Sequence, residues 1–414
     1  MNSNNNQLQR RPILAEWKFL ISIILIATMM RVPLTVVGPL MGDIKADLYI
    51  SNTVAGLLTT IPLLIFGLVS PYVIKMVEVS SLRHTVFIAI VLIFIGLLVR
   101  VMGDIYFFIG GTILIAIGIA FTNVAMPSFV MLKFPFQIGI ITGVYSTTMN
   151  LVSGLGSGFV VPLSHASPYG YKFGLGFWAI LAFIALIVWI RQLFLNPNTI
   201  ARFVVNKNNN KYTFKNVAKS KLVWAITCLF GGQSIIFYSL VAWAPTMLVD
   251  KGISLHTAGY FFMYLQLIVI PTTFIFPMLI AKLENQRVIA FLIGGFFLLG
   301  FLLFFTSNPI ALFCAMLLIG AGIGASFSSC MALFALKAET HSGSIGLSGF
   351  AQSVGYIFAA IGPILMGLLF DIFDSTNMNI IIFLVIGLVC FVATVVATKK
   401  MTIEQSLAHV FNKD

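Results

Sequence analysis

The chain has 414 residues, of which 59% are hydrophobic and only 9% are charged, whereas soluble domains carry about 25% charged residues. This composition excludes a soluble globular protein. Apolar runs of about 20 residues recur along the chain and predict an all-α integral membrane protein. The formal charge of +12 does not indicate nucleic-acid binding, because the basic residues lie in short segments between apolar runs.

In chain order, the apolar runs predict twelve transmembrane helices. They cover 19–42, 53–76, 84–102, 106–130, 138–162, 172–194, 222–248, 255–281, 287–305, 308–335, 345–370 and 377–398. With both termini in the cytoplasm, 19 of the 24 Lys and Arg residues lie in cytoplasmic segments, as the positive-inside bias requires. The external loops would hold Lys45, Arg100, Lys172 and Lys251. We therefore expect a multi-pass protein of the bacterial cytoplasmic membrane with both termini inside.

The longest polar connection divides the spans into two groups of six. The expected organisation is a cytoplasmic tail (1–18), an N-terminal half (19–194), a cytoplasmic linker (195–221), a C-terminal half (222–398) and a second cytoplasmic tail (399–414). Short patterns recur between the halves at a nearly constant offset, including Gly118 with Gly322 and Gly143 with Gly349. The two halves are therefore predicted to be parallel repeats, the arrangement of many secondary transporters with a central cavity.

Arg31 is the one formally charged residue near the middle of a predicted span. An unpaired guanidinium at the bilayer centre costs between ~2.5 and ~17 kcal/mol, so Arg31 is expected to face a polar interior. All acidic residues fall at span ends or in loops, which leaves an anionic substrate as a natural partner for the planar guanidinium. The alternative is that Arg31 bonds to carbonyls or polar side chains across the bundle and only stabilises the fold.

The stretch RVPLTVVGPLM from Arg31 and the stretch AGLLTTIPLLIFGLVSP from Ala55 resemble the cyanate and nitroimidazole permease branch of the major facilitator superfamily. The proline at Pro33 comes one residue later than in that pattern. The resemblance implies twelve helices in two halves and movement of small solutes by alternating access. It does not define the substrate, because members of the family handle chemically different small molecules.

The loop between the second and third spans departs from the pattern G-x-x-x-D-R-x-G-R-R/K that major facilitators commonly carry. The chain reads GLVSPYVIKMVEVSSLR from Gly67, and the acidic-then-basic cluster is mostly missing. Lys75, Glu78 and Arg83 are candidates for a reduced gate network. The alternative is that these three residues are interfacial anchors.

Further candidates for the substrate site follow from helical spacing, which places residues three, four and seven apart on one face. Thr28, Arg31 and Thr35 would form one stripe, and Asn150 belongs to another with Thr142, Ser146 and Ser153. Gln352 is the repeat counterpart of Ser146, and Gln233 lies near the counterpart of Arg31. The remaining candidates, for which packing is the alternative, are Asn123, Tyr145, Tyr238 and Trp243.

The sequence therefore predicts a secondary active transporter for a small anionic or electron-rich solute such as cyanate, nitrate, a small carboxylate or a nitroimidazole. We expect a monomer in the lipid bilayer, with no catalytic residue, metal or cofactor, and no P-loop pattern for nucleotide is present. The coupling ion is open, with a proton as one candidate. The alternatives are a multidrug exporter of neutral compounds, whose pocket the 39 Phe and 17 Met could line, and a membrane sensor without transport.

Overall fold

The computed structural model describes residues 17–50, 52–194, 212–373 and 375–411, and every regular element in these ranges is a helix. The N-terminal half contains α1 (Trp17–Met29), α2 (Val32–Thr35), α3 (Met41–Leu48), α4 (Asn52–Val69), η3 (Ser70–Tyr72), α5 (Val73–Ser80), α6 (Leu82–Val99), α7 (Ile105–Lys133), α8 (Ile138–His165), α9 (Tyr171–Gly176) and α10 (Ala179–Phe194). The predicted all-α fold is confirmed.

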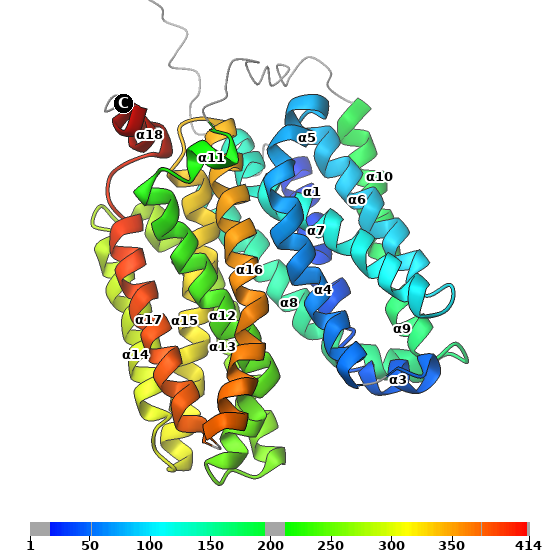
Figure 1. The fold of residues 1–414 in the computed structure, drawn as a ribbon. Coiled ribbons are helices and arrows are strands. Elements are labelled where there is room, and N and C mark those ends of the chain that lie inside the picture. Colours follow the sequence, from blue (N-terminus) through cyan, green and yellow to red (C-terminus); the bar gives the residue numbers. More distant parts are fainter. Residues whose placement is uncertain (1–16, 51, 195–211, 374, 412–414) are drawn as a thin grey trace, which may run out of the picture.

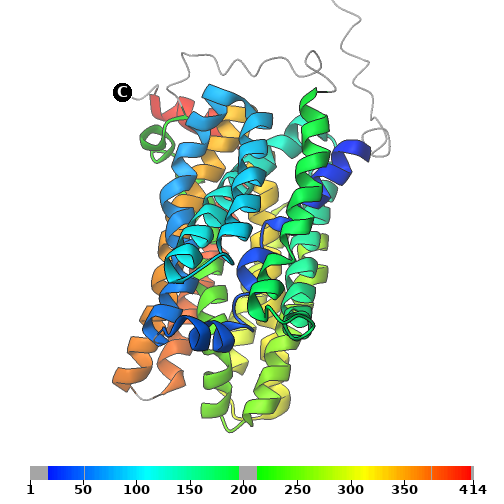
Figure 2. The ribbon, with the colours of Figure 1, turned by 90° about the vertical axis from the view of Figure 1, so that its right-hand side faces the viewer.

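The C-terminal half contains α12 (Lys221–Asp250), α13 (Leu255–Lys282), α14 (Arg287–Leu303), α15 (Pro309–Leu336), α16 (His341–Phe373) and α17 (Thr376–Ala397). Two further helices, α11 (Phe214–Val217) and α18 (Ile403–Phe411), lie in the expected linker and the expected tail. Most of the predicted linker and the tail 1–16 fall outside the described residues. Figures 1 and 2 place α11 and α18 at one end of the bundle and α3 at the opposite end.

Each predicted span coincides with a helical segment. Eleven described segments are long and apolar enough to cross a membrane, and α14 is a shorter apolar helix of 17 residues. A proline interrupts the second span, because proline has no backbone N–H to bond to the preceding turn. The second span accordingly consists of α4, the short helix η3 around Pro71, and α5.

The prediction of a continuous first helix over 19–42 is wrong. The chain leaves α1 after Met29, and Arg31 precedes α2 with a non-helical backbone conformation (φ −141°, ψ −40°). Pro33 follows within the first turn of α2 and lacks the N–H that would continue the α1 ladder. Thr28, Arg31 and Thr35 therefore do not share the face of one helix.

The side chain of Arg100, which the sequence predicts in an external loop, is buried. Arg100 follows the last residue of α6 and is only 1% exposed. Its long side chain turns into the protein, where its Nη1 atom donates a hydrogen bond to the carbonyl oxygen of Pro33 over 2.6 Å. The distribution of charged residues along the sequence predicts that Arg100 lies near the end of a span, but it does not predict that the side chain is buried.

The internal repeat is visible in the packing between the halves. Gly143 in α8 lies so close to α13 that an added Cβ would stand 2.7 Å from the carbonyl oxygen of Phe274. Its repeat partner Gly349 in α16 lies close to the other half, with the Ser70 carbonyl oxygen 3.0 Å from the equivalent point. Glycine at both positions allows helices of opposite halves to approach closely. In Figure 1, α16 accordingly runs beside α4.

Candidate functional site

A cavity of about 40 Å³ lies between the halves. Its lining residues come from the segment between α1 and α2 and from α2, α4, α7, α8, α12, α15 and α16: Met30, Arg31, Leu34, Phe66, Asn123, Met149, Gln233, Ser234, Phe237, Tyr238, Phe327 and Tyr356. Arg31 is the only charged residue among them. The cavity wall therefore carries one positive charge and no negative charge.

The break in the first span positions the Arg31 side chain. Its Nη1 atom donates a 2.5 Å hydrogen bond to Oδ1 of Asn150 in α8. Nδ2 of Asn150 donates to the Ser146 carbonyl oxygen one turn earlier, at 2.8 Å, and this bond orients the amide so that its oxygen faces Arg31. Because Asn150 is uncharged, this contact leaves the guanidinium charge uncompensated.

Aromatic rings surround the guanidinium. It lies 4.5 Å from the ring centroid of Phe237 and 5.9 Å from that of Phe327, distances at which a cation is attracted to a ring face. On the other side of the cavity, the rings of Phe66 and Tyr356 pack with centroids 4.9 Å apart. The site is therefore an apolar aromatic enclosure with a single cation.

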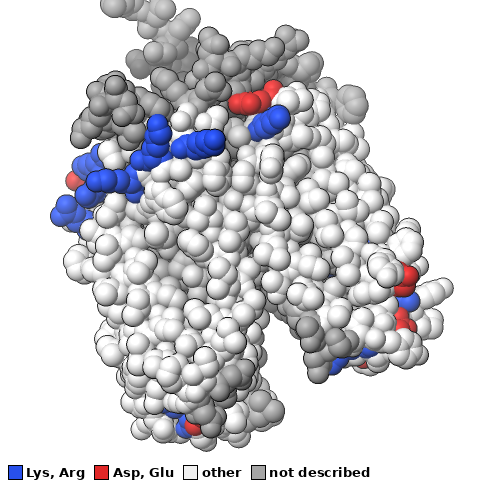
Figure 3. Space-filling model, in the orientation of Figure 1, with Lys and Arg blue, Asp and Glu red and all other residues white. Residues whose placement is uncertain are grey.

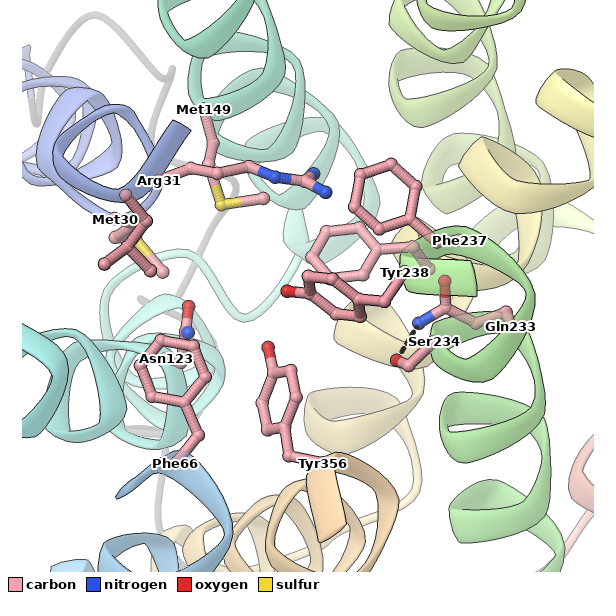
Figure 4. A pocket seen from close by; sticks show the side chains of 12 residues that line it. Met30, Arg31, Phe66, Asn123, Met149, Gln233, Ser234, Phe237, Tyr238 and Tyr356 are labelled. Atoms are coloured by element: carbon pink, nitrogen blue, oxygen red, sulfur yellow. Dashed lines mark hydrogen bonds between the residues drawn. The ribbon is translucent and has the colours of Figure 1, made fainter. Parts of the chain in front are cut away.

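Polar groups face Arg31 across the cavity. Figure 4 shows the hydroxyls of Tyr238 and Tyr356 and the amide of Asn123 directed toward the space in front of Arg31. Among the described residues, none of these three side-chain groups has a hydrogen-bond partner. Gln233, by contrast, donates to the Ser234 hydroxyl and to the Phe230 carbonyl oxygen. The three unpartnered groups can therefore donate to a bound molecule.

Four of the sequence-predicted site residues line the cavity: Arg31, Asn123, Gln233 and Tyr238. Asn150 contacts the site through Arg31. Gln352 is fully buried and donates to the Asn123 carbonyl oxygen over 3.2 Å, so it supports the backbone of a lining residue.

The other predicted residues lie in helix packing. Thr28 donates to the Leu25 carbonyl oxygen, and Thr35 accepts a hydrogen bond from the Ser153 hydroxyl. Tyr145 is buried in α8. The Trp243 indole donates to the Pro363 carbonyl oxygen at 2.9 Å. None of the four is among the residues that line the cavity.

The candidates for a gate lie at the end of the bundle that carries α18. Lys75 and Glu78 are exposed on α5, and Arg83 is half-buried at the start of α6. The described contacts that join the halves on this side of the cavity come from α16, and also from α8 and α13, where Gly139 lies against Pro277. Ser353 donates to the Gly67 carbonyl oxygen at 2.5 Å, and Ser348 donates to the Val124 carbonyl oxygen at 2.9 Å.

The halves separate toward the opposite end. Figure 3 shows the surface hollowed between them at the end away from α18, and most Lys and Arg visible in this view gather near the α18 end. Exposed lysines at that end include Lys75 on α5, Lys219 and Lys221 beside α11, and Lys399 and Lys400 before α18. The structure is therefore closed at the α18 end and parted at the α3 end.

Sequence reasoning missed several lining residues, including Phe66, Phe237, Phe327 and Tyr356. The three phenylalanines are hard to distinguish from the other 36 in the chain, because most phenylalanines in a membrane bundle face lipid or pack between helices. Tyr356 could have been found, since it lies four residues after Gln352 and therefore on the same face of α16.

Two helical halves with a cavity at their interface are the arrangement found in many secondary transporters. The profile of the Major Facilitator Superfamily matches residues 20–360. The chain therefore belongs to the major facilitator superfamily.

Three relatives share most of the chain. The uncharacterized transporter YycB of Bacillus subtilis is 36% identical over 87% of this chain and 88% of its own length. The 2-nitroimidazole transporter of Escherichia coli is 32% identical over 84% and 87%, and the cyanate transport protein CynX of Escherichia coli is 27% identical over 87% and 92%. These matches confirm the branch-level resemblance read from residues 31–71. The chain is a membrane transporter and not an enzyme.

A solved structure supports the same fold. The proton:xylose symporter XylE aligns with a TM-score of 0.75 over 95% of this chain and 98% of its own, at 14% identity. At this identity, the likeness concerns the fold alone.

Proposed function

We propose that the protein is a secondary active transporter for a small, flat, anionic or electron-rich solute, with Arg31 as its direct contact. The observation that carries this proposal is the Arg31 guanidinium at the cavity wall, whose one hydrogen-bond partner among the described residues is the uncharged Asn150. A guanidinium binds flat anions and nitro or carboxylate oxygens through parallel N–H donors. A solute that supplies such oxygens would satisfy the donors that Asn150 leaves free.

The aromatic walls favour a planar solute. Phe237 and Phe327 flank the guanidinium, and the hydroxyls of Tyr238 and Tyr356 face it. A flat molecule between these walls can accept from Arg31 at one edge and from the tyrosine hydroxyls at the other. Two relatives are named as transporters of 2-nitroimidazole and cyanate, and these names support a solute of this kind.

The transport cycle would use the two halves, 19–194 and 222–398, as moving units. The α18 end, with its exposed lysines, would face the cytoplasm by the positive-inside bias, which also assigns both termini to that side. The structure would then represent a state closed to the cytoplasm through α16 and parted toward the outside. Lys75, Glu78 and Arg83 would contribute to the cytoplasmic closure. We propose a monomeric unit, because both halves of the cavity come from one chain.

The competing function is efflux of neutral or amphiphilic drugs. A single uncompensated cation in the wall would repel lipophilic cations. This charge favours the small anionic or electron-rich solute.

Ligand-induced thermal stabilisation of the purified protein tests the proposal. The panel contains cyanate, nitrate, acetate, 2-nitroimidazole and tetraphenylphosphonium, with chloride at equal ionic strength as the control. We expect at least one of the first four ligands to raise the melting temperature in a saturable manner. Stabilisation by tetraphenylphosphonium alone would refute the proposal and favour the drug exporter.

A further inference from the structure

Arg100 carries a buried guanidinium, and the transport site described above does not use it. It is 1% exposed, although it lies at the end of a membrane-spanning helix where an arginine could reach the aqueous interface. The guanidinium lies 6.0 Å from the ring centroid of Phe108. Its one hydrogen-bond acceptor among the described residues is the Pro33 carbonyl oxygen, at 2.6 Å. This contact joins the third span to the interruption of the first.

The interruption has few strong hydrogen bonds of its own. The backbone bonds from Thr35 to Arg31, from Val36 to Val32 and from Val37 to Leu34 have N to O distances of 3.2 to 3.4 Å. An interrupted helix inside a membrane needs other groups to satisfy its free carbonyls. Two side chains from other helices do so here, since Ser157 donates to the Thr35 carbonyl oxygen at 3.3 Å and Arg100 donates to that of Pro33. The Arg100 bond is the shorter and the charge-assisted one, and such bonds are the stronger class.

Close packing fixes the backbone from which Arg100 extends. Gly96 in α6 and Gly111 in α7 face each other, and a Cβ added at Gly111 would stand 2.5 Å from the Arg100 amide nitrogen. The two helices therefore meet at this point without side chains between them. Arg100 thus reaches Pro33, two residues after Arg31, from a rigid support.

We infer that Arg100 is a positioning residue for the transport site. It holds the interruption of the first span in the shape that directs Arg31 into the cavity, and it does so without contacting the solute. The inference about binding rests on the proposed function, whereas the inference about the shape of the interruption does not. Loss of the Arg100 bond would leave Arg31 correctly directed in only a fraction of molecules, and apparent affinity falls in proportion to that fraction.

Hydrogen–deuterium exchange on the purified protein tests whether Arg100 holds the shape of the interruption, and it needs no ligand. We expect Arg100→Met to raise exchange in peptides that cover residues 30–41 by about tenfold, while peptides from α12 to α17 remain unchanged, because local opening exposes only local amides. Arg100→Lys, which keeps a cation and one donor, is expected to restore most of the protection. A matched control is Lys251→Met, which removes a cation that donates to the Phe305 carbonyl oxygen at the same end of the other half.

Solute binding tests whether Arg100 affects the affinity of the transport site. We expect Arg100→Met to raise the dissociation constant and the transport KM by about tenfold at an almost unchanged maximal rate, and Arg100→Lys to come within about threefold of the wild type. Unchanged exchange over 30–41, a uniform loss of protection in both halves, or an Arg100→Lys variant as impaired as Arg100→Met would overturn the inference. If Arg100→Met does not fold, the comparison of Arg100→Gln with Arg100→Lys gives the same decision. If no panel ligand binds the wild type, the proposed function fails, while the exchange experiment still decides the role of Arg100.

Discussion

A single substitution at Asn150 can neutralise the charge of the site, because Asn150 accepts the hydrogen bond from Arg31. The substitution Asn150→Asp replaces the amide by a carboxylate of nearly the same shape, whose oxygen would stand where Oδ1 now accepts the 2.5 Å bond from Arg31. The nitrogen of the amide, which donates to the Ser146 carbonyl oxygen, is lost at the same time. The net charge of the Arg31 pair would fall from +1 to zero.

The expected loss of anion-binding free energy follows from the charge that the substitution introduces. Two unit charges about 4 Å apart attract each other by about 4 kcal/mol at an effective dielectric constant of about 20. A solute anion would have to compete with this built-in carboxylate. Allowing for the half-buried position of both residues, we expect a loss of about 2.7 kcal/mol, which corresponds to about a hundredfold weaker anion binding. The melting temperature should not fall, since an ion pair replaces the hydrogen bond between Arg31 and an uncharged amide.

The matched control is Asn150→Leu, which has a similar size but no acceptor. It leaves Arg31 without its partner, and the loss of a hydrogen bond to a charged group costs about 1.5–3 kcal/mol of stability. Anion binding should be retained or strengthened, because the guanidinium is then free for the solute. Isothermal titration calorimetry and thermal denaturation measure both effects. If Asn150→Asp binds the anion as tightly as the wild type does, Arg31 is not the anion contact.

Three further predictions concern other contacts. Gly67→Val places a Cβ 2.6 Å from Ile357 and 3.2 Å from the Ser353 carbonyl oxygen, and spin-label distances across the α18 end should lengthen as that end opens; unchanged distances would contradict the closure by α16. Glu404→Ala removes the carboxylate that accepts from the backbone amides of Glu339 and Thr340 at 3.0 Å, and proteolysis between α17 and α18 should accelerate; an unchanged cleavage rate would show that α18 is held by other contacts. Burial lowers the pKa of Lys337 to about 8 from about 10.4 in an unfolded chain, so the unfolded chain binds more protons between these values and stability should rise with pH across this window. Lys337→Met should flatten that rise in denaturation curves, and a rise of equal slope in the variant would assign it to other groups.

The helical content and the number of spans could be predicted, because membrane-length apolar runs and the distribution of Lys and Arg are properties of the sequence alone. The interruption at Arg31 could not be predicted with the same rules. Pro33 weakens the helix at this point, but prolines at Pro127 and Pro245 are accommodated within α7 and α12. What differs at Pro33 is the supply of donors from distant segments, Arg100 and Ser157, which only the tertiary structure brings together.

The residues of the candidate site could likewise be predicted only in part from the sequence. Arg31 could be recognised from its cost in a bilayer, and Asn150 from its place on a polar stripe. The stripe predicted for Thr28 and Thr35 requires a continuous helix, whereas the Thr28 hydroxyl donates to the Leu25 carbonyl oxygen and the Thr35 hydroxyl accepts from Ser153. The burial of Arg100 could not be predicted from the number of Lys and Arg in each loop, because that number records where a cation lies along the chain and not the direction of its side chain.

Uptake into proteoliposomes by the wild type and by Arg31→Ala tests directly whether Arg31 is the contact for the transported solute. The solute is the member of the stabilisation panel that binds the wild type, and both proteins are first shown to be folded and monodisperse. We expect saturable, gradient-dependent uptake by the wild type and loss of uptake by Arg31→Ala, with Arg31→Lys also impaired because an ammonium lacks the planar pair of donors. Normal uptake by a folded Arg31→Ala protein would contradict this expectation.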